Sequence, residues 1–170
     1  RSQIKIFSTA HCDSSMGSSS TLGTDAHARQ GCVIMIGVFI DMEGIVQGKS
    51  SLQTTVALST CEAELTASSW CAKIIIGLVN LFKEIFDGAT IEIPRLFADN
   101  KAANLLASNQ ASMRNHRHLM LPQIWIRQQT KNDAIKIFDI YTHLNTSDML
   151  TKVLPHDKLI ALLKLLGYTV

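Results

Sequence analysis

The continuous apolar run GCVIMIGVFI, at residues 31–40, is the feature that most restricts how this chain can fold. Alternate residues of a strand point to opposite sides, so apolar side chains at successive positions predict a strand buried on both faces. Turn-forming residues follow at 41–44, and residues 45–51 predict a returning strand. Together with an opening strand at residues 4–13, these segments predict an antiparallel meander.

The segment after the meander predicts a long helix that covers one face of the sheet. Ser59 followed three residues later by Glu62 is a capping box, and apolar residues at helical spacing continue to about Phe86. The residues expected to face the sheet are Leu65, Ile74, Leu78 and Leu81.

The remainder of the chain alternates between strands and helices. Strands are predicted at 91–98 and 134–142, and helices at 99–109, 113–130, 146–152 and 156–166. This alternation favours parallel strands after the antiparallel start, so the predicted fold class is α/β, a five-stranded mixed sheet with helices on both faces. At 170 residues, of which 46% are apolar, the chain is long enough for one core, and residues 1–170 are predicted to form a single domain.

Composition restricts the setting of the protein. Its four cysteines show neither a CxxC pair nor a zinc-type spacing, which favours a reduced, intracellular chain over a disulfide framework. The longest apolar stretch, near residues 74–82, is too short to cross a bilayer and is followed by Lys83 and Glu84, so no membrane span is predicted.

Charge is distributed unevenly, although the net charge is only +2. From Lys101 to Asn132 the chain contains no Asp or Glu. A basic strip of this kind can follow a phosphate backbone, and the alternative is a solvated helix face that lacks acids. The candidate nucleic-acid-binding residues are Lys101, Arg114, Arg117, Arg127 and Lys131.

Four segments carry a resemblance to one family: GCVIMIG at 31–37, TTVALSTCEAEL at 54–65, LFADNKAANLL at 96–106 and TSDMLTKVLP at 146–155. In this order they resemble the ribonuclease H domain of copia-type retrotransposon polyproteins, which reads ALSSTEAEY, then CDNQ, then LADILTKPLP. The resemblance implies a ribonuclease H fold and Mg²⁺-dependent hydrolysis of RNA in RNA–DNA hybrids. Carboxylates suit this chemistry because Mg²⁺ prefers hard oxygen ligands.

The resemblance transfers three acidic positions to this chain. Glu64, Asp99 and Asp148 match the family's acids in the first helix, after the fourth strand and in a late helix. They are the expected catalytic residues and the ligands of any Mg²⁺, and their carboxylates are expected to converge. Each also has a structural alternative: a solvated Glu64 in a first helical turn, a helix cap at Asp99, and a local capping arrangement of Asn145 with Asp148.

The opening strand departs from the family at its most demanding position. The family reads YSDAD there, and the alignment places Thr9 where the first Asp bridges both metals. A threonine hydroxyl carries no charge, and Asp13 lies four residues further on, roughly 13 Å at a rise of about 3.3 Å per residue. Thr9 is therefore expected to replace the first catalytic Asp, with Asp13 too distant to take its place.

This departure favours a degenerate domain that is catalytically inactive. The expected role is a structural or binding subunit of a larger assembly, with protein subunits as partners and possibly RNA. One alternative is an active Mg²⁺-dependent ribonuclease H with a rearranged first ligand, such as Asp13, or a one-metal mechanism. Another is a fragment of a decaying retrotransposon polyprotein. His143, in the loop before Asp148, is either a residue that approaches the site or an ordinary loop histidine.

Overall fold

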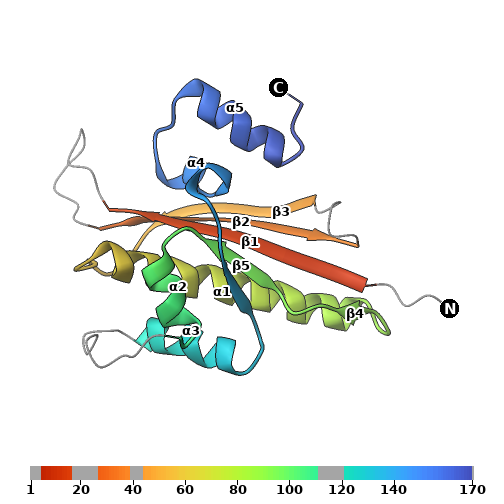
Figure 1. The fold of residues 1–170 in the computed structure, drawn as a ribbon. Coiled ribbons are helices and arrows are strands. Elements are labelled where there is room, and N and C mark those ends of the chain that lie inside the picture. The colour runs from red at the N-terminus through yellow and green to blue at the C-terminus, as the bar shows by residue number, and fades with distance from the viewer. Residues whose placement is uncertain (1–4, 17–26, 39–43, 111–120, 170) are drawn as a thin grey trace.

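The meander predicted for the first third of the chain forms three adjacent strands of a mixed sheet (Figure 1). The computed structural model describes residues 5–16, 27–38, 44–110 and 121–169. Strands β1 (Lys5–Ser15), β2 (Arg29–Gly37) and β3 (Gly44–Leu52) pair antiparallel, with Cys12 opposite Cys32 in the register of β1 and β2. This pairing confirms the predicted hairpins.

The later strands extend the sheet in parallel, giving the order β3-β2-β1-β5-β6. Pro94 divides the segment predicted as one strand into β4 (Thr90–Ile91) and β5 (Arg95–Ala98). β4 pairs with the start of β1 beside the main path, and β6 (Lys136–Asp139) pairs with β5. The mixed α/β sheet is confirmed, with five main strands and the short β4 as a sixth.

Helices cover both faces of the sheet (Figure 1). On one face lie α1 (Thr60–Ile85), α2 (Lys101–Ala107) and α3 (Leu121–Lys131). On the other lie α4 (Asp148–Thr151) and α5 (His156–Leu165), after the short 3-10 helix η1 (Thr142–Leu144). Pro122 occupies the first turn of α3, where a missing backbone N–H costs little, and the earlier part of the helix predicted from residue 113 lies outside the described residues.

Helix α1 begins with the predicted cap. The Ser59 hydroxyl accepts a hydrogen bond from the Glu62 amide at 3.1 Å, and the Glu62 carboxylate accepts one from the Leu58 amide at 2.9 Å. Glu62 therefore belongs to the cap, and its side chain is not available to a site. This leaves Glu64 as the acidic residue of the first turns that can face the sheet.

The predicted buried face of α1 is correct only in part. Leu65 is buried, whereas Ile74 and Leu78 are half-buried and Leu81 is 49% exposed. The stripe that contacts the sheet instead continues through small and branched residues: Ala72, Ile75 and Val79. Small side chains bring a helix close to a sheet, and this close approach sets a rotation of α1 that apolar spacing alone did not indicate.

Helix α1 has the length and mean hydropathy of a membrane-spanning helix. The prediction that no apolar stretch is long enough to cross a bilayer is therefore wrong on length. The same helix packs on the sheet as the central element of the core, and 44% of its most apolar window is buried there. Core helices pass such tests as well, because burial against a sheet selects the same apolar residues as burial in lipid.

Candidate metal-binding active site

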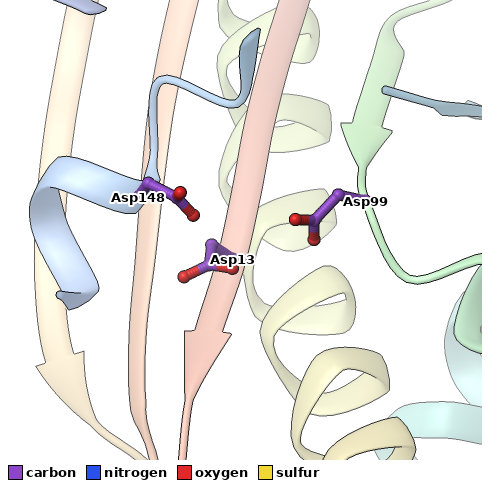
Figure 2. A group of neighbouring side chains, drawn as sticks. All are labelled: Asp13, Asp99 and Asp148. Carbon is purple, nitrogen blue, oxygen red and sulfur yellow. The ribbon is translucent and has the colours of Figure 1, made fainter. Parts of the chain in front are cut away.

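Three buried or half-buried carboxylates converge at one end of β1. The nearest oxygens of Asp13, Asp99 and Asp148 all lie within 4.8 Å of one another. Figure 2 shows the three side chains pointing toward a common point from β1, from the connection between β5 and α2, and from the start of α4. Because these elements are far apart in sequence, only the fold brings the three acids together.

Asp13 supplies the carboxylate of the first strand. The expectation that it lies too far along β1 to join the other acids is wrong, because the acids gather at the level of Asp13 and not at the level of Thr9. β1 continues to Ser15, beyond the predicted end of the strand, and carries Asp13 into the cluster. Thr9 lies four residues earlier, buried opposite Met35 of β2 and Arg95 of β5.

Asp99 is directed to the cluster because its neighbour caps the helix. The Asn100 side chain accepts a hydrogen bond from the Ala103 amide at 3.1 Å and is the N-cap of α2. The alternative reading of Asp99 as that cap is therefore wrong. Asp99 remains half-buried at the end of β5, with its carboxylate turned toward Asp13 (Figure 2).

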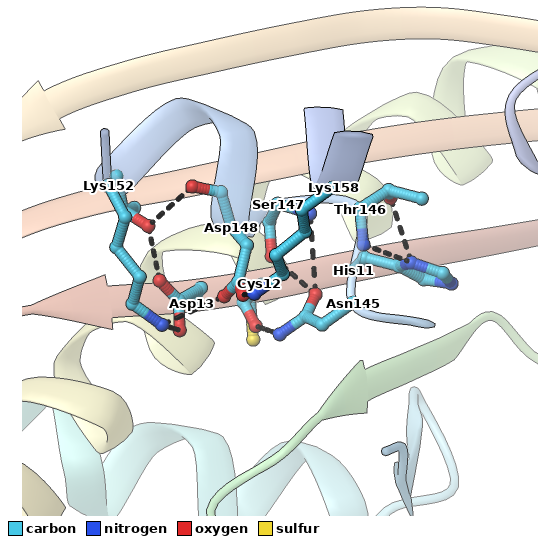
Figure 3. Close-up of polar contacts among 10 residues, drawn as sticks. His11, Cys12, Asp13, Asn145, Thr146, Ser147, Asp148, Lys152 and Lys158 are labelled. Atoms are coloured by element: carbon cyan, nitrogen blue, oxygen red, sulfur yellow. Dashed lines mark hydrogen bonds and ion pairs between the residues drawn. The ribbon is translucent and has the colours of Figure 1, made fainter. Parts of the chain in front are cut away.

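Asp148 is held in place by the residues that precede it. The Asn145 amide donates to the Cys12 carbonyl at 2.9 Å, while its carbonyl oxygen accepts from the Ser147 hydroxyl at 2.6 Å (Figure 3). These contacts attach the start of α4 to β1 beside Asp13. The Asn145 side chain therefore bonds to Ser147 and not, as the capping alternative supposed, to the Asp148 carboxylate. The Asp148 carboxylate points into the cluster instead.

His11, the residue before Cys12 on β1, binds the same segment through Thr146. Its Nδ1 accepts the Thr146 amide N–H at 3.3 Å and lies 2.8 Å from the Thr146 hydroxyl. Burial lowers the pKa of His11 to about 4, so the ring is neutral and can accept these contacts. His143 instead lies exposed in η1, where its ring stacks on Tyr141 with centroids 5.7 Å apart.

Two lysines contact the cluster, a feature that the sequence reading did not include. Lys152 Nζ lies 3.0 Å from Asp13 Oδ1 and 2.8 Å from Asp148 Oδ1, and Lys158 Nζ lies 2.7 Å from Asp148 Oδ2 (Figure 3). The Thr151 hydroxyl also donates to Asp13. Burial alone would lower the pKa of Lys152, but the hydrogen bonds and charges of Asp148 and Asp13 raise it above its usual range. Burial raises the pKa of Asp13 in turn, against these favourable contacts.

Glu64, on the second turn of α1, is not one of the three acids whose oxygens lie within 4.8 Å of one another, but its charge interacts with those of Asp13 and Asp99. Its side chain is buried, and among the described residues its Oε2 atom has no hydrogen-bond partner. Burial, followed by the nearby charges of Asp13 and Asp99, raises the pKa of Glu64 to about 8. A buried carboxylate oxygen without a donor beside two other carboxylates is an environment in which a cation would satisfy it.

The four acids therefore fit a divalent metal ion by the chemistry of their donors. Asp13, Asp99 and Asp148 form the cluster, and Glu64, whose charge interacts with those of Asp13 and Asp99, adds a fourth hard oxygen ligand nearby. The buried oxygen of Glu64 that lacks a hydrogen-bond donor could be satisfied by a cation. Among the residues that the structure describes, only carboxylates form this group, which favours Mg²⁺ or Mn²⁺ over Zn²⁺.

The raised pKa of Glu64 leads to a testable pH dependence. In the absence of metal, the folded chain keeps the Glu64 proton up to about pH 8, whereas the unfolded chain releases it near 4.5. The contribution of Glu64 to folding stability is therefore fully present below the unfolded pKa and is lost as pH rises through the folded one. Relative to Glu64→Gln, the wild type should lose a few kcal/mol between pH 5 and 9, at about 1.4 kcal/mol per pKa unit.

Urea denaturation in EDTA at a series of pH values measures this difference. The comparison with Glu64→Gln removes the contributions of titrating groups that do not interact with Glu64, such as His11. A difference in unfolding free energy that stays constant from pH 5 to 9 would show that Glu64 ionises normally.

The predicted basic strip is only partly described. Lys101 and Lys131 are exposed at the start of α2 and the end of α3. Arg127 instead holds these helices together, since its guanidinium donates to the Leu106 carbonyl at 2.6 Å and to the Asn109 side chain. Arg114 and Arg117 lie outside the described residues. Contact between the strip and nucleic acid remains a prediction, best supported at Lys101 and Lys131.

Comparison with known proteins links this geometry to a family. No family model matches the chain. Over 115 residues, or 68% of the chain, it is 33% identical to the Retrovirus-related Pol polyprotein from transposon TNT 1-94 of Nicotiana tabacum. That protein is the Pol polyprotein of a copia-type retrotransposon. The chain is a ribonuclease H-like domain related to copia-type retrotransposon polyproteins. It spans only 8% of the length of this relative.

Solved structures agree on the fold of this ribonuclease H-like domain. The N-terminal RNase H domain of rv2228c from Mycobacterium tuberculosis aligns over 95% of the chain and 98% of its own length, with a TM-score of 0.55 and 14% identity. The RNase H domain of PFV aligns over 95% of the chain and 92% of its own length, with a TM-score of 0.54 and 13% identity. LC11-RNase H1, solved in complex with an RNA/DNA hybrid, covers 84% of the chain and 92% of its own length, with a TM-score of 0.50 and 12% identity. At such identities the likeness establishes the fold alone.

Proposed function

We propose that this ribonuclease H-like domain is a divalent-metal-dependent nuclease that hydrolyses the RNA strand of RNA–DNA hybrids. The observation that carries the proposal is the convergence of Asp13, Asp99 and Asp148, with the buried Glu64 beside them. The argument for an inactive domain depended on a missing acid in the first strand, and Asp13 supplies a carboxylate from that strand. Relatedness to a retrotransposon polyprotein favours hybrids as the substrate class, as does the hybrid bound by LC11-RNase H1.

In this proposal each residue has a defined task. Asp13, Asp99 and Asp148, with Glu64 nearby, would hold Mg²⁺, which when bound would supply charge stabilisation at the scissile phosphate and activate water. Asn145, Ser147 and His11 keep the start of α4 against β1, so that Asp148 is oriented before substrate arrives. Lys101 and Lys131 would contact the phosphate backbone.

An assay of hybrid cleavage tests the proposal. A labelled RNA annealed to complementary DNA should be cut in Mg²⁺ and left intact in EDTA, while the same RNA paired with RNA should be resistant. An Asp99→Asn protein purified in parallel controls for contaminating host nucleases. Absence of cleavage in both Mg²⁺ and Mn²⁺, from folded protein, would reject the nuclease function.

A second candidate function is favoured by the ion pairs of Lys152 and Lys158. Two ammonium groups already offset the charge of Asp13 and Asp148, which a domain without metal would require. Such a domain would serve as a structural or binding subunit of a larger assembly. Folded protein that neither binds Mg²⁺ nor cleaves hybrids would support this role. Free thiols at all four cysteines favour a reducing compartment for either function.

A further inference from the structure

Lys152 joins two of the four proposed metal ligands. Its ammonium group contacts one oxygen of Asp13 on β1 and one oxygen of Asp148 on α4, at 3.0 and 2.8 Å (Figure 3). The two aspartate side chains are 1% and 0% exposed, whereas the lysine side chain is 34% exposed. A positive group that enters from the surface therefore bridges two carboxylates that have almost no access to solvent.

The remaining oxygens of the pair are also engaged by the chain itself. Lys158 Nζ contacts the second oxygen of Asp148 at 2.7 Å, and the Thr151 hydroxyl donates to the second oxygen of Asp13. Two buried carboxylates in proximity repel each other, and burying them unpaired is costly. The lysine contacts offset that repulsion, so this part of the site is electrostatically satisfied by the protein alone.

We infer that Lys152 is a positioning residue that holds Asp13 and Asp148 together when no divalent ion is bound, and that it competes with the ion for the same two oxygens. This inference rests on the proposed function, because it assumes that Asp13 and Asp148 are metal ligands. An ammonium and a divalent cation in contact with the same oxygen pair repel strongly in a buried setting. Lys152 can withdraw because its flexible four-carbon stem already reaches solvent.

Two consequences follow for the metal-free and metal-bound protein. Without metal, Lys152 should contribute to stability, because its removal leaves Asp13 and Asp148 with less compensation. With metal, the energy of displacing Lys152 reduces the net binding energy, so a variant without this charge should bind Mg²⁺ more tightly. These opposite effects distinguish competition from a lysine that only supports the fold.

The test measures Mg²⁺ binding and thermal unfolding without nucleic acid, in wild type, Lys152→Met, Lys152→Arg and Lys164→Met. Lys164 lies exposed on α5, forms none of the ion pairs described above, and controls for the loss of one positive charge. Lys152→Met should unfold at lower temperature in EDTA and bind Mg²⁺ about tenfold more tightly by calorimetry, the change expected when a competing charge is removed. Lys152→Arg and Lys164→Met should bind like wild type.

Each outcome decides the inference. The inference is overturned if Lys152→Met binds Mg²⁺ as tightly as wild type or more weakly. It is also overturned if neither protein binds Mg²⁺. If Lys152→Met does not fold in EDTA, added Mg²⁺ should restore folding, since the ion replaces the lost ammonium, and failure to do so would reject competition. Tighter binding without any hybrid cleavage would reject the nuclease function while supporting the competition.

Discussion

Replacing Asp13 with Asn should reduce Mg²⁺-dependent hybrid cleavage by roughly 10³-fold, because a lost carboxylate removes several kcal/mol of metal-mediated stabilisation. Asp13 is the first-strand member of the acidic cluster and is fully buried within it. Its amide isostere keeps the shape of the side chain and removes the charge. The rate of product formation at saturating hybrid is the quantity to compare.

Thr9→Val is the matched control for Asp13→Asn. Thr9 lies on the same strand and is similarly buried, and valine preserves its branched shape. Cleavage by Thr9→Val should stay within about threefold of wild type, since a position outside the metal-ligand set has little effect on the transition state. The reverse pattern, an active Asp13→Asn and an inactive Thr9→Val, would return the first-strand role to Thr9.

Gly31→Ala should destabilise the protein by about 2–3 kcal/mol, the upper range for overpacking in a fitted interior. A Cβ atom at Gly31 would lie 2.8 Å from Leu150 Cβ and 2.9 Å from Thr151 Cγ2, both on α4. It would also lie 3.2 Å from the Ser147 carbonyl. The absence of a side chain at this position of β2 is thus what allows α4 to bring Asp148 against β1.

Cleavage should fall together with stability in Gly31→Ala, because any relief of the overlap moves α4 and with it Asp148. Gly48→Ala is the control, since a Cβ at this position of β3 meets nothing within 4 Å. That variant should keep wild-type activity, with stability unchanged or slightly increased. Urea denaturation gives the stability difference, and activity is normalised to folded protein. Similar stability of the two variants would mean that α4 does not require close approach at Gly31.

The structure places Asp13 in the acidic cluster, where the motif alignment had placed Thr9. This shows the limit of an alignment made along one strand. Matching the family motif from Phe7 placed Thr9 at the metal position, because the count began at an aromatic residue early in the strand. The structure places the cluster four residues later, since the end of β5 and the start of α4 both meet β1 at Asp13. Where three separate elements meet depends on sheet register and helix docking, which one strand does not encode.

Several local features, in contrast, were accessible from sequence. The cap at Ser59 and the strand run of β2 depend on neighbours within a few residues, and both appear in the structure. Asp99 and Asp148 were carried over from the family motifs that they match, and the fold brings both into one cluster. Strong short-range signals of this kind determine where elements begin and end.

The sequence by itself determined the order of strands and helices and the mixed sheet, because periodicity and capping are short-range properties of the chain, while the resemblance of its motifs to one family supplied Glu64, Asp99 and Asp148 as acidic candidates. Only the tertiary structure decided that Asp13 joins them, that Asn100 rather than Asp99 caps α2, and that Lys152 bridges the cluster. Lys152 and Asp13 are 139 residues apart, and their contact exists only because α4 packs on the bare backbone at Gly31. Electrostatic partners at such separations are fixed by packing and register, whose outcome depends on the whole fold.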